Sequence, residues 1–307
     1  MGKTAFLFAG QGAQYSGMGK SLYDSSAAVK ALYDAAEQIR PNTMAQSFSG
    51  TDEELKQTAN TQPCLYLVDL AAALALEEAG VHADGAAGFS LGEIAALAFA
   101  DVYSSADGFR IVCARGQLMQ DAAAEADTAM CAVVKLDAET VEKTAAEFDQ
   151  LYAVNFNSPG QTVVSGLKTS MPAFSEKIKS MKGKCIPVAV SAAFHSPFMN
   201  GAAEKFGKEL AAFSFSAPRI PVYANCNALP YPDDNAAQLM QQQICNPVRW
   251  QTIIENMIAD GFTDFIEVGA GKTLSGLVKR ISSDVRIYHV ENAETLAETV
   301  KAVKESC

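Results

Sequence analysis

The sequence is poor in basic residues and has no long uncharged apolar run. Its 24 lysine and arginine residues are outnumbered by 35 aspartate and glutamate residues, which gives a net charge of −11 at pH 7. Nucleic-acid binding needs a basic face for the phosphates, so we expect no nucleic-acid partner. No segment approaches the roughly 18 uncharged residues that span a membrane, and the N-terminus has no apolar signal region. The sequence therefore predicts a protein of the cytoplasm that has no membrane partner.

Paired cysteine motifs are also absent. The seven cysteines are an odd number, show no Cys-x-x-Cys spacing and have no histidine at the spacing of a metal ligand. We expect reduced, mostly buried thiols and no metal site. Hydrophobic residues at 49% and charged residues at 19% of 307 positions are typical of a globular protein with a sizeable core. The cysteines are Cys64, Cys113, Cys131, Cys185, Cys226, Cys245 and Cys307.

The most informative local pattern is Gly-x-Ser-x-Gly at residues 88–92. It follows small apolar residues and precedes a helix-prone run at 94–98, which is the setting of a nucleophile elbow. In such an elbow the glycines permit a tight strand-to-helix turn, and the helix start aims backbone N–H groups at an oxyanion. Ser90 is therefore the candidate nucleophile, with a purely structural glycine turn as the alternative.

A serine hydroxyl needs a base, and the chain has only three histidines. His82 lies in a loop, and His289 lies within the apolar, strand-like run 285–290. His195 lies in a turn of small residues and proline that follows the strand-like run 186–190. Elimination of the other two favours His195 as the base, with an incidental loop histidine as the alternative.

A second glycine-rich turn, at residues 9–14, follows the strand predicted at 4–8. Turns after parallel strands gather at the carboxyl edge of the sheet, which is also where the elbow would lie. The turn lacks a Gly-Lys-Ser/Thr ending and a complete Gly-x-Gly-x-x-Gly, so an oxyanion-binding turn is favoured over a phosphate-binding loop. The turn at 268–272 also completes no phosphate motif, and we interpret it as a strand-to-helix connection.

Strands and helices alternate along most of the chain, which predicts an α/β fold with a mostly parallel, hydrolase-like sheet and helices on both faces. We expect a large catalytic domain over 1–126 and 192–307. Its predicted elements are strand 4–8, a helix that starts after Gln62-Pro63 and ends near 78, a strand that ends near 88, a helix from 91, strands 222–225 and 265–268, helix 274–281, strand 287–290 and a helix from 293.

Residues 127–191 follow a different order, which predicts a small inserted domain. The order β-α-β-β-α-β is that of a ferredoxin-like unit, and it falls between Ser90 and His195. The active site should then lie in the cleft between the two bodies. The predicted elements are strand 130–136, helix 138–148, strands 152–156 and 162–165, helix 171–181 and strand 185–190.

Six ordered motifs together resemble those of malonyl-CoA:acyl carrier protein transacylases, over nearly the whole chain. They lie at residues 10–14, 88–93, 115–119, 155–161, 194–197 and 247–250. The resemblance implies a malonyltransferase of fatty-acid biosynthesis that works through a malonyl-serine intermediate in a ping-pong reaction. It implies malonyl-CoA and acyl carrier protein as partners, no cofactor, and a monomer.

The resemblance also implies roles for individual residues. Ser90 attacks the thioester, and His195 takes its proton. The backbone N–H groups of Gln11 and Leu91 form the oxyanion hole. The planar fork of Arg115 pairs with the free malonyl carboxylate.

Three further positions follow from the same resemblance. A main-chain carbonyl near Gln243, rather than a carboxylate, orients the base. Phe89 departs from the family, where the residue before the nucleophile is commonly histidine, so a polar role of that side chain is not expected here. Phe194 agrees with the malonyl-selective pattern, and we expect methylmalonyl-CoA to be a poor substrate because a bulky ring leaves little room for a methyl branch.

Three alternatives stay open. A serine hydrolase or lipase would send the acyl group to water and would have no use for Arg115. A non-catalytic module would have lost Ser90 or His195. A discrete acyltransferase of a polyketide synthase would differ only in its carrier protein. Because carrier proteins are acidic, docking requires a basic patch, and the available clusters are Lys177, Lys179, Lys182 and Lys184, or Lys272, Lys279 and Arg280.

Overall fold

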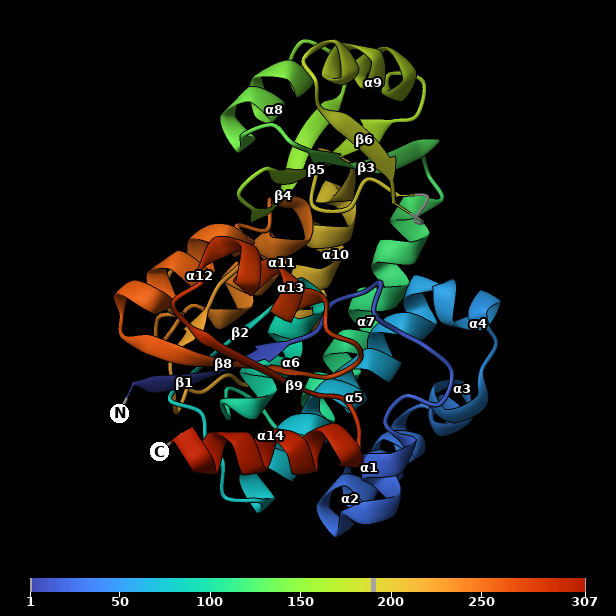
Figure 1. Cartoon of the computed structure of the whole chain (residues 1–307). Helices are drawn as coiled ribbons and strands as arrows, with labels where there is room; N and C mark the ends of the chain where they lie inside the picture. The colour runs from blue at the N-terminus through green and yellow to red at the C-terminus, as the bar shows by residue number, and fades with distance from the viewer. Residues whose placement is uncertain (1, 189–191, 307) are drawn as a thin grey trace.

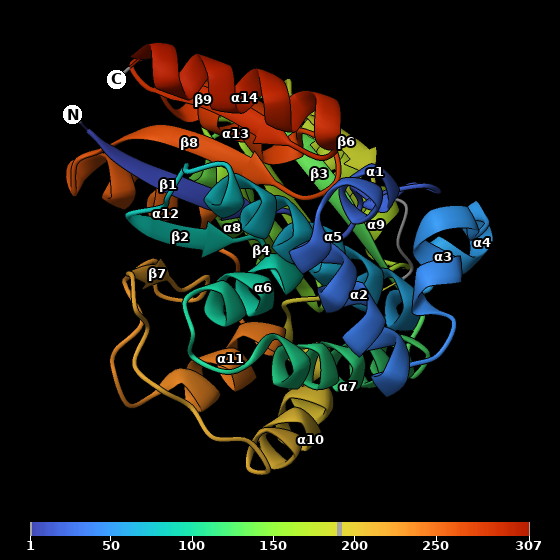
Figure 2. The same ribbon diagram turned by 90° about the horizontal axis from the view of Figure 1, so that it is seen from below.

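The computed structural model describes residues 2–188 and 192–306. Its larger body is built on a five-stranded sheet in which every neighbouring pair is parallel, in the order β7-β2-β1-β8-β9 (Figure 2). This arrangement brings the carboxyl ends of β1 and β2 side by side. The strands are β1 (Lys3–Phe8), β2 (Gly85–Gly88), β7 (Val222–Tyr223), β8 (Phe262–Val268) and β9 (Arg286–Val290).

Alternation along β1 explains why helices cover both faces of this sheet. Phe6 and Phe8 belong to one buried cluster, whereas Ala5 and Leu7 belong to another, as the two-residue period of a strand requires. The first cluster packs against α5 (Thr58–Glu78), α6 (Leu91–Phe99), α7 (Ser105–Ala123) and α14 (Ala293–Ser306). The second packs against α12 (Trp250–Ala259) and α13 (Thr273–Ile281), on the opposite side (Figure 1).

The smaller body is an antiparallel sheet in the order β4-β5-β3-β6 (Figure 1, top). Two helices cover one face of this sheet, and the buried cluster between the helices and the sheet includes Phe174 and Ile178. The chain order β-α-β-β-α-β confirms the predicted ferredoxin-like unit. Its elements are β3 (Thr128–Val134), α8 (Ala138–Ala145), β4 (Leu151–Ser158), β5 (Gln161–Leu167), α9 (Met171–Ser180) and β6 (Lys184–Pro187).

The predicted α/β fold class is confirmed, while the domain boundaries 1–126, 127–191 and 192–307 stay a prediction. The boundary at 191 and the predicted continuation of a strand over 189–190 lie outside the described residues. Along the described ranges, no helix is both long enough and apolar enough to cross a bilayer. The remaining helices are α1 (Lys20–Ser25), α2 (Ala27–Ile39), α3 (Thr43–Ser49), α4 (Asp52–Lys56), η1 (Pro197–Met199), α10 (Asn200–Leu210) and α11 (Ala236–Cys245).

Several predicted boundaries are wrong, among them the end of α8 and the start of β8, and two others have a clear physical reason. Helix α5 begins at Thr58 rather than after Pro63, which lies inside the helix. A proline there loses one backbone hydrogen bond, but most of the 21 residues of α5 are buried, and this packing holds the helix. Strand β7 ends at Tyr223 because Ala224 closes a turn, accepting from the N–H of Ala228 at 2.9 Å.

Candidate active site

The segment around Ser90 forms a tight strand-to-helix turn. Ser90 lies between β2 and α6 with φ 54° and ψ −103°, a backbone conformation that residues other than glycine rarely adopt. A Cβ atom on Gly88 would lie 2.0 Å from the backbone of Gly92, and one on Gly92 would lie 2.3 Å from the carbonyl oxygen of Phe8. Both flanking glycines are therefore sterically required, as an elbow demands.

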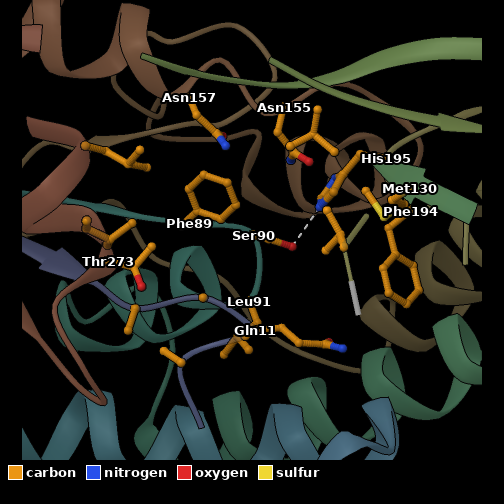
Figure 3. A pocket seen from close by; sticks show the side chains of 18 of the residues that line it. Gln11, Phe89, Ser90, Leu91, Met130, Asn155, Asn157, Phe194, His195 and Thr273 are labelled. Atoms are coloured by element: carbon orange, nitrogen blue, oxygen red, sulfur yellow. Dashed lines mark hydrogen bonds between the residues drawn. The ribbon is translucent and has the colours of Figure 1, made fainter. Parts of the chain in front are cut away.

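The structure brings Ser90 and His195 together across 105 residues of sequence. Ser90 Oγ lies 2.8 Å from His195 Nε2 (Figure 3). His195 Nδ1 lies 2.9 Å from the main-chain oxygen of Gln243, which can only accept a hydrogen bond. Nδ1 must therefore carry the ring proton, which leaves Nε2 free to accept the serine proton. The other two histidines lie elsewhere, His82 on the surface and His289 on β9.

Arg115 reaches the same hydroxyl from helix α7. Its Nη2 donates to Ser90 Oγ at 3.1 Å and to Gln243 Oε1 at 2.7 Å, and its Nη1 donates to Gln62 Oε1 at 2.7 Å. The side chain is fully buried, yet within residues 2–188 and 192–306 none of the ion pairs involves it. Burial lowers the pKa of Arg115 to about 10, so that the guanidinium remains charged at neutral pH. A buried cation therefore stands beside the hydroxyl. It forms no direct ion pair within the described residues, although the nearby carboxyl of Glu93 acts on it electrostatically.

Two backbone segments meet at the elbow. Leu91 is the first residue of α6, so its N–H has no partner within the helix. The turn after β1 lies against the elbow, since a Cβ on Gly10 would come within 2.8 Å of the Phe89 carbonyl oxygen. Gln11 and Leu91 both line the cavity at Ser90 (Figure 3). This is the placement that an oxyanion hole requires.

The cavity in front of Ser90 has a volume of about 310 Å³ and is walled by both bodies of the protein. This agrees with the predicted cleft. The larger body contributes residues from the elbow, the turn after β1 and helix α13. The smaller body contributes Met130, Ala132, Asn155, Asn157, Gln161 and Val163.

Comparison with known proteins shows which family this chain belongs to. The acyl transferase domain family matches residues 5–300. A malonyl CoA-acyl carrier protein transacylase of Bacillus subtilis is 37% identical over 312 residues, which cover 99% of this chain and 98% of the relative. The chain belongs to the malonyl-CoA:acyl carrier protein transacylase family.

Solved structures of transacylases share its fold as well. A malonyl CoA-acyl carrier protein transacylase from Clostridium perfringens superposes with a TM-score of 0.96 at 35% identity, covering 99% of this chain and 98% of that chain. A malonyl-transacylase solved in complex with a type II PKS acyl-carrier protein has a TM-score of 0.93 at 32% identity, covering 98% of this chain and 99% of that chain.

Phe89 is the residue that the sequence singled out as differing from the usual transacylase pattern. Its ring packs against Trp250 with centroids 5.5 Å apart and also lines the cavity (Figure 3). The position next to the nucleophile is therefore an apolar wall. Phe194 is 8% exposed and lines the cavity as well, near Met130. Two aromatic rings therefore line the cavity in front of Ser90.

Four functional neighbours of this transacylase site were not found from the sequence. Gln62 holds Arg115, and Asn225 accepts a hydrogen bond from the Ser90 N–H at 2.8 Å. Behind Asn225, the buried carboxylate of Glu93 accepts a hydrogen bond from the hydroxyl of Tyr231. Burial raises the pKa of Glu93 to about 7, although the hydrogen bonds from Tyr231 and Asn225 oppose the shift. The only local signal was Glu93, which directly follows the elbow glycine.

The candidate base, His195, should stay neutral in mild acid. Burial, and secondly the charge of Arg115, lower the pKa of His195 from 6.5 to about 4. His195 therefore stays neutral down to that pH, and we expect the acidic limb of kcat/KM for malonyl-enzyme formation near pH 4 to 5. An acidic limb of kcat/KM at pH 6.5 or above would contradict this prediction.

The same shift makes stability depend on pH. Between pH 6.5 and about 4, the unfolded chain binds a proton at His195 that the folded chain does not bind. Folding should therefore lose stability as pH falls through this window. Urea unfolding at pH 7 and pH 5 tests this, with His195→Gln as the variant whose stability should change less between the two pH values.

Proposed function

We propose that the chain moves a malonyl group from malonyl-CoA to the phosphopantetheine thiol of an acyl carrier protein, as a step of fatty-acid biosynthesis. The observation that carries this proposal is the buried guanidinium of Arg115, which forms no salt bridge within the described residues and points at Ser90 Oγ. A malonyl group bears a free carboxylate that supplies the missing counter-charge. An acyl group without that carboxylate would leave the buried cation without a direct salt bridge.

In the first half-reaction, Ser90 gives its proton to His195 Nε2 while its oxygen attacks the thioester carbonyl carbon. The negative charge that develops on the carbonyl oxygen is stabilised by the N–H groups of Gln11 and Leu91. The carbon–sulfur bond then breaks, and the CoA sulfur takes the proton from His195. The carbonyl of Gln243 holds the ring in one tautomer, so that a Ser-His dyad needs no carboxylate.

In the second half-reaction, the carrier thiol gives its proton to His195, and its sulfur attacks the malonyl-Ser90 carbonyl carbon. The ester bond breaks, and Ser90 recovers its proton. The acyl group is activated throughout as a thioester or an ester, so the chemistry calls for no cofactor.

Radiolabelled malonyl-CoA tests this proposal directly. We expect label on the isolated protein, and we expect it to move to a carrier protein that bears the pantetheine thiol. Loss of label only to water would establish a hydrolase, and no attachment would establish a non-catalytic protein. Fatty-acid and polyketide carriers are compared in parallel, because the rate of transfer to each identifies the acceptor.

We infer that the carrier docks on the basic cluster of α13. Lys272, Lys279 and Arg280 are exposed, and α13 also lines the cavity through Leu274 and Leu277. Arg280 donates to the cavity residue Gln161 at 3.1 Å, so the cluster lies next to the cavity wall. The competing cluster on α9 lies at the far end of the smaller body, and Lys177 there is paired with Glu147 at 3.3 Å (Figure 1).

Reversing two charges of this cluster should weaken carrier use. For Lys279→Glu with Arg280→Glu, we expect the KM for the carrier to rise on the order of tenfold, because rim charges mainly steer encounter. Malonyl-enzyme formation from malonyl-pantetheine, which lacks the charged nucleotide, should change little. Lys177→Glu with Lys179→Glu is the matched control. A larger effect in that control would assign docking to α9 instead.

We further infer that the protein acts as a monomer in the cytoplasm. Ser90, His195, Arg115 and Gln243 all come from one chain, and so the site needs no second copy. The described cysteines are all free, as in a reducing compartment.

A further inference from the structure

Asn225 joins the two sides of the nucleophile elbow through one side-chain amide. It follows the edge strand β7 and is fully buried. Its Oδ1 accepts from the Ser90 N–H at 2.8 Å, and its Nδ2 donates to the carbonyl oxygen of Gly88 at 2.7 Å. One amide thus connects the end of β2 to the residue that precedes α6.

Asn225 is itself held by a buried carboxylate. Its own N–H donates to Glu93 Oε2 at 2.6 Å, and the hydroxyl of Tyr231 donates to the other oxygen of Glu93. The carbonyl oxygen of Asn225 accepts from the N–H of Arg249 at 2.9 Å. Backbone and side chain are therefore both constrained, and a buried amide held in this way has one orientation.

The second peptide beside Ser90 is held by another amide. Gln243 Nε2 donates to the Ser90 carbonyl oxygen at 2.7 Å, whereas Asn225 binds the N–H on the other side. The two peptides that flank Ser90 thus each have a side-chain partner from a distant part of the chain. These peptides define φ and ψ of Ser90, whose strained values persist only where the surroundings impose them.

The direction of these bonds has a consequence for catalysis. Because Asn225 takes the Ser90 N–H, that group is not free to bind an oxyanion, and the next N–H belongs to Leu91, which lines the cavity. We propose that Asn225, oriented by Glu93, is a positioning residue that sets the angle of Ser90 Oγ and of the Leu91 N–H. This inference rests on the proposed role of Ser90 as the nucleophile.

The test compares acylation rates with substrate binding. For Asn225→Ala, we expect the rate of malonyl-Ser90 formation to fall on the order of 100-fold, the loss typical of a reacting atom displaced by about 1 Å. The KM for malonyl-CoA should stay within about threefold, since Asn225 does not line the cavity. The rate at which phenylmethylsulfonyl fluoride modifies Ser90 should fall in parallel, because this reagent needs no malonyl pocket.

Three variants separate positioning from simple loss of stability. Glu93→Gln keeps an oxygen that accepts from the Asn225 N–H, and its acylation rate should stay within about tenfold of wild type, whereas Glu93→Ala should resemble Asn225→Ala. Asn60→Ala is the control, because Asn60 bonds Arg40 and Glu54 outside the cavity. This control should lower the melting temperature without lowering the acylation rate at 20 °C.

Two results would overturn the inference. One is Asn225→Ala acylating within twofold of wild type; the other is a lost rate that returns when the variant is assayed further below its melting temperature. If wild type itself forms no malonyl-Ser90, the proposed function fails. If wild type forms it and Asn225→Ala forms it equally fast, only this inference fails.

Discussion

Ser90→Ala should abolish both malonyl labelling of the protein and transfer to the carrier. The expected loss in kcat/KM is on the order of 10⁴-fold or more, because nucleophile and base act as a unit and removal of either member ends the covalent route. The fold should survive, since the backbone bonds of Ser90 to Asn225 and Gln243 do not involve the hydroxyl. Mass spectrometry after mixing with malonyl-CoA reads the acyl adduct directly.

Ser47→Ala provides the matched control for this variant. Ser47 is a buried serine whose hydroxyl donates to the Met18 carbonyl oxygen, away from the cavity. It should retain full labelling. A malonyl adduct on Ser90→Ala with the mass of one acyl group would show that another residue is the nucleophile.

Arg115→Ala should separate malonyl from neutral acyl groups. Removing one partner of a buried charge pair costs about 2–5 kcal/mol, so malonyl transfer should fall roughly 30- to 5,000-fold. Transfer of an acetyl group, which has no carboxylate to pair, should fall far less. Acylation of Ser90 by malonyl-CoA and by acetyl-CoA, measured side by side, gives the ratio.

Two further variants show what the ratio of malonyl to acetyl transfer means. Arg115→Lys keeps the charge but loses the fork that holds Gln62 and Gln243, and it should fall between wild type and Arg115→Ala. Arg110→Ala, on the same helix but paired with Asp107 on the surface, should behave as wild type. Equal losses for malonyl and acetyl groups would mean that Arg115 acts through its bond to Ser90 Oγ rather than on a carboxylate.

Several features of the fold and site followed from local sequence. The elbow around Ser90 could be predicted because two glycines and a serine at fixed spacing encode a backbone conformation that few other residues tolerate. The proximity of His195 to Ser90 could be predicted because the chain has few histidines. The order of elements in the smaller body followed from the alternation of apolar residues, which is a property of each segment by itself.

Other parts of the site lie beyond what local patterns carry. The start of α5 was missed because a proline is a strong local signal, whereas burial on all sides of that helix is a tertiary effect. The roles of Gln243 and Arg115 came from resemblance to a family. Spacing alone does not distinguish a buried arginine from one on a helix surface.

The sequence by itself determined the reaction class, the nucleophile-elbow turn around Ser90 and the succession of strands and helices, because these depend on neighbouring residues. Only the tertiary structure decided which side chains hold Ser90 in place. Asn225 and Gln243 are 135 and 153 residues from Ser90, and Gln62 is 53 residues from Arg115. Asparagine and glutamine residues are common along the chain, so their local sequence does not mark them as part of the site. They reach Ser90 and Arg115 only because the parallel sheet brings the ends of β2 and β7 together and α7 and α11 pack beside them.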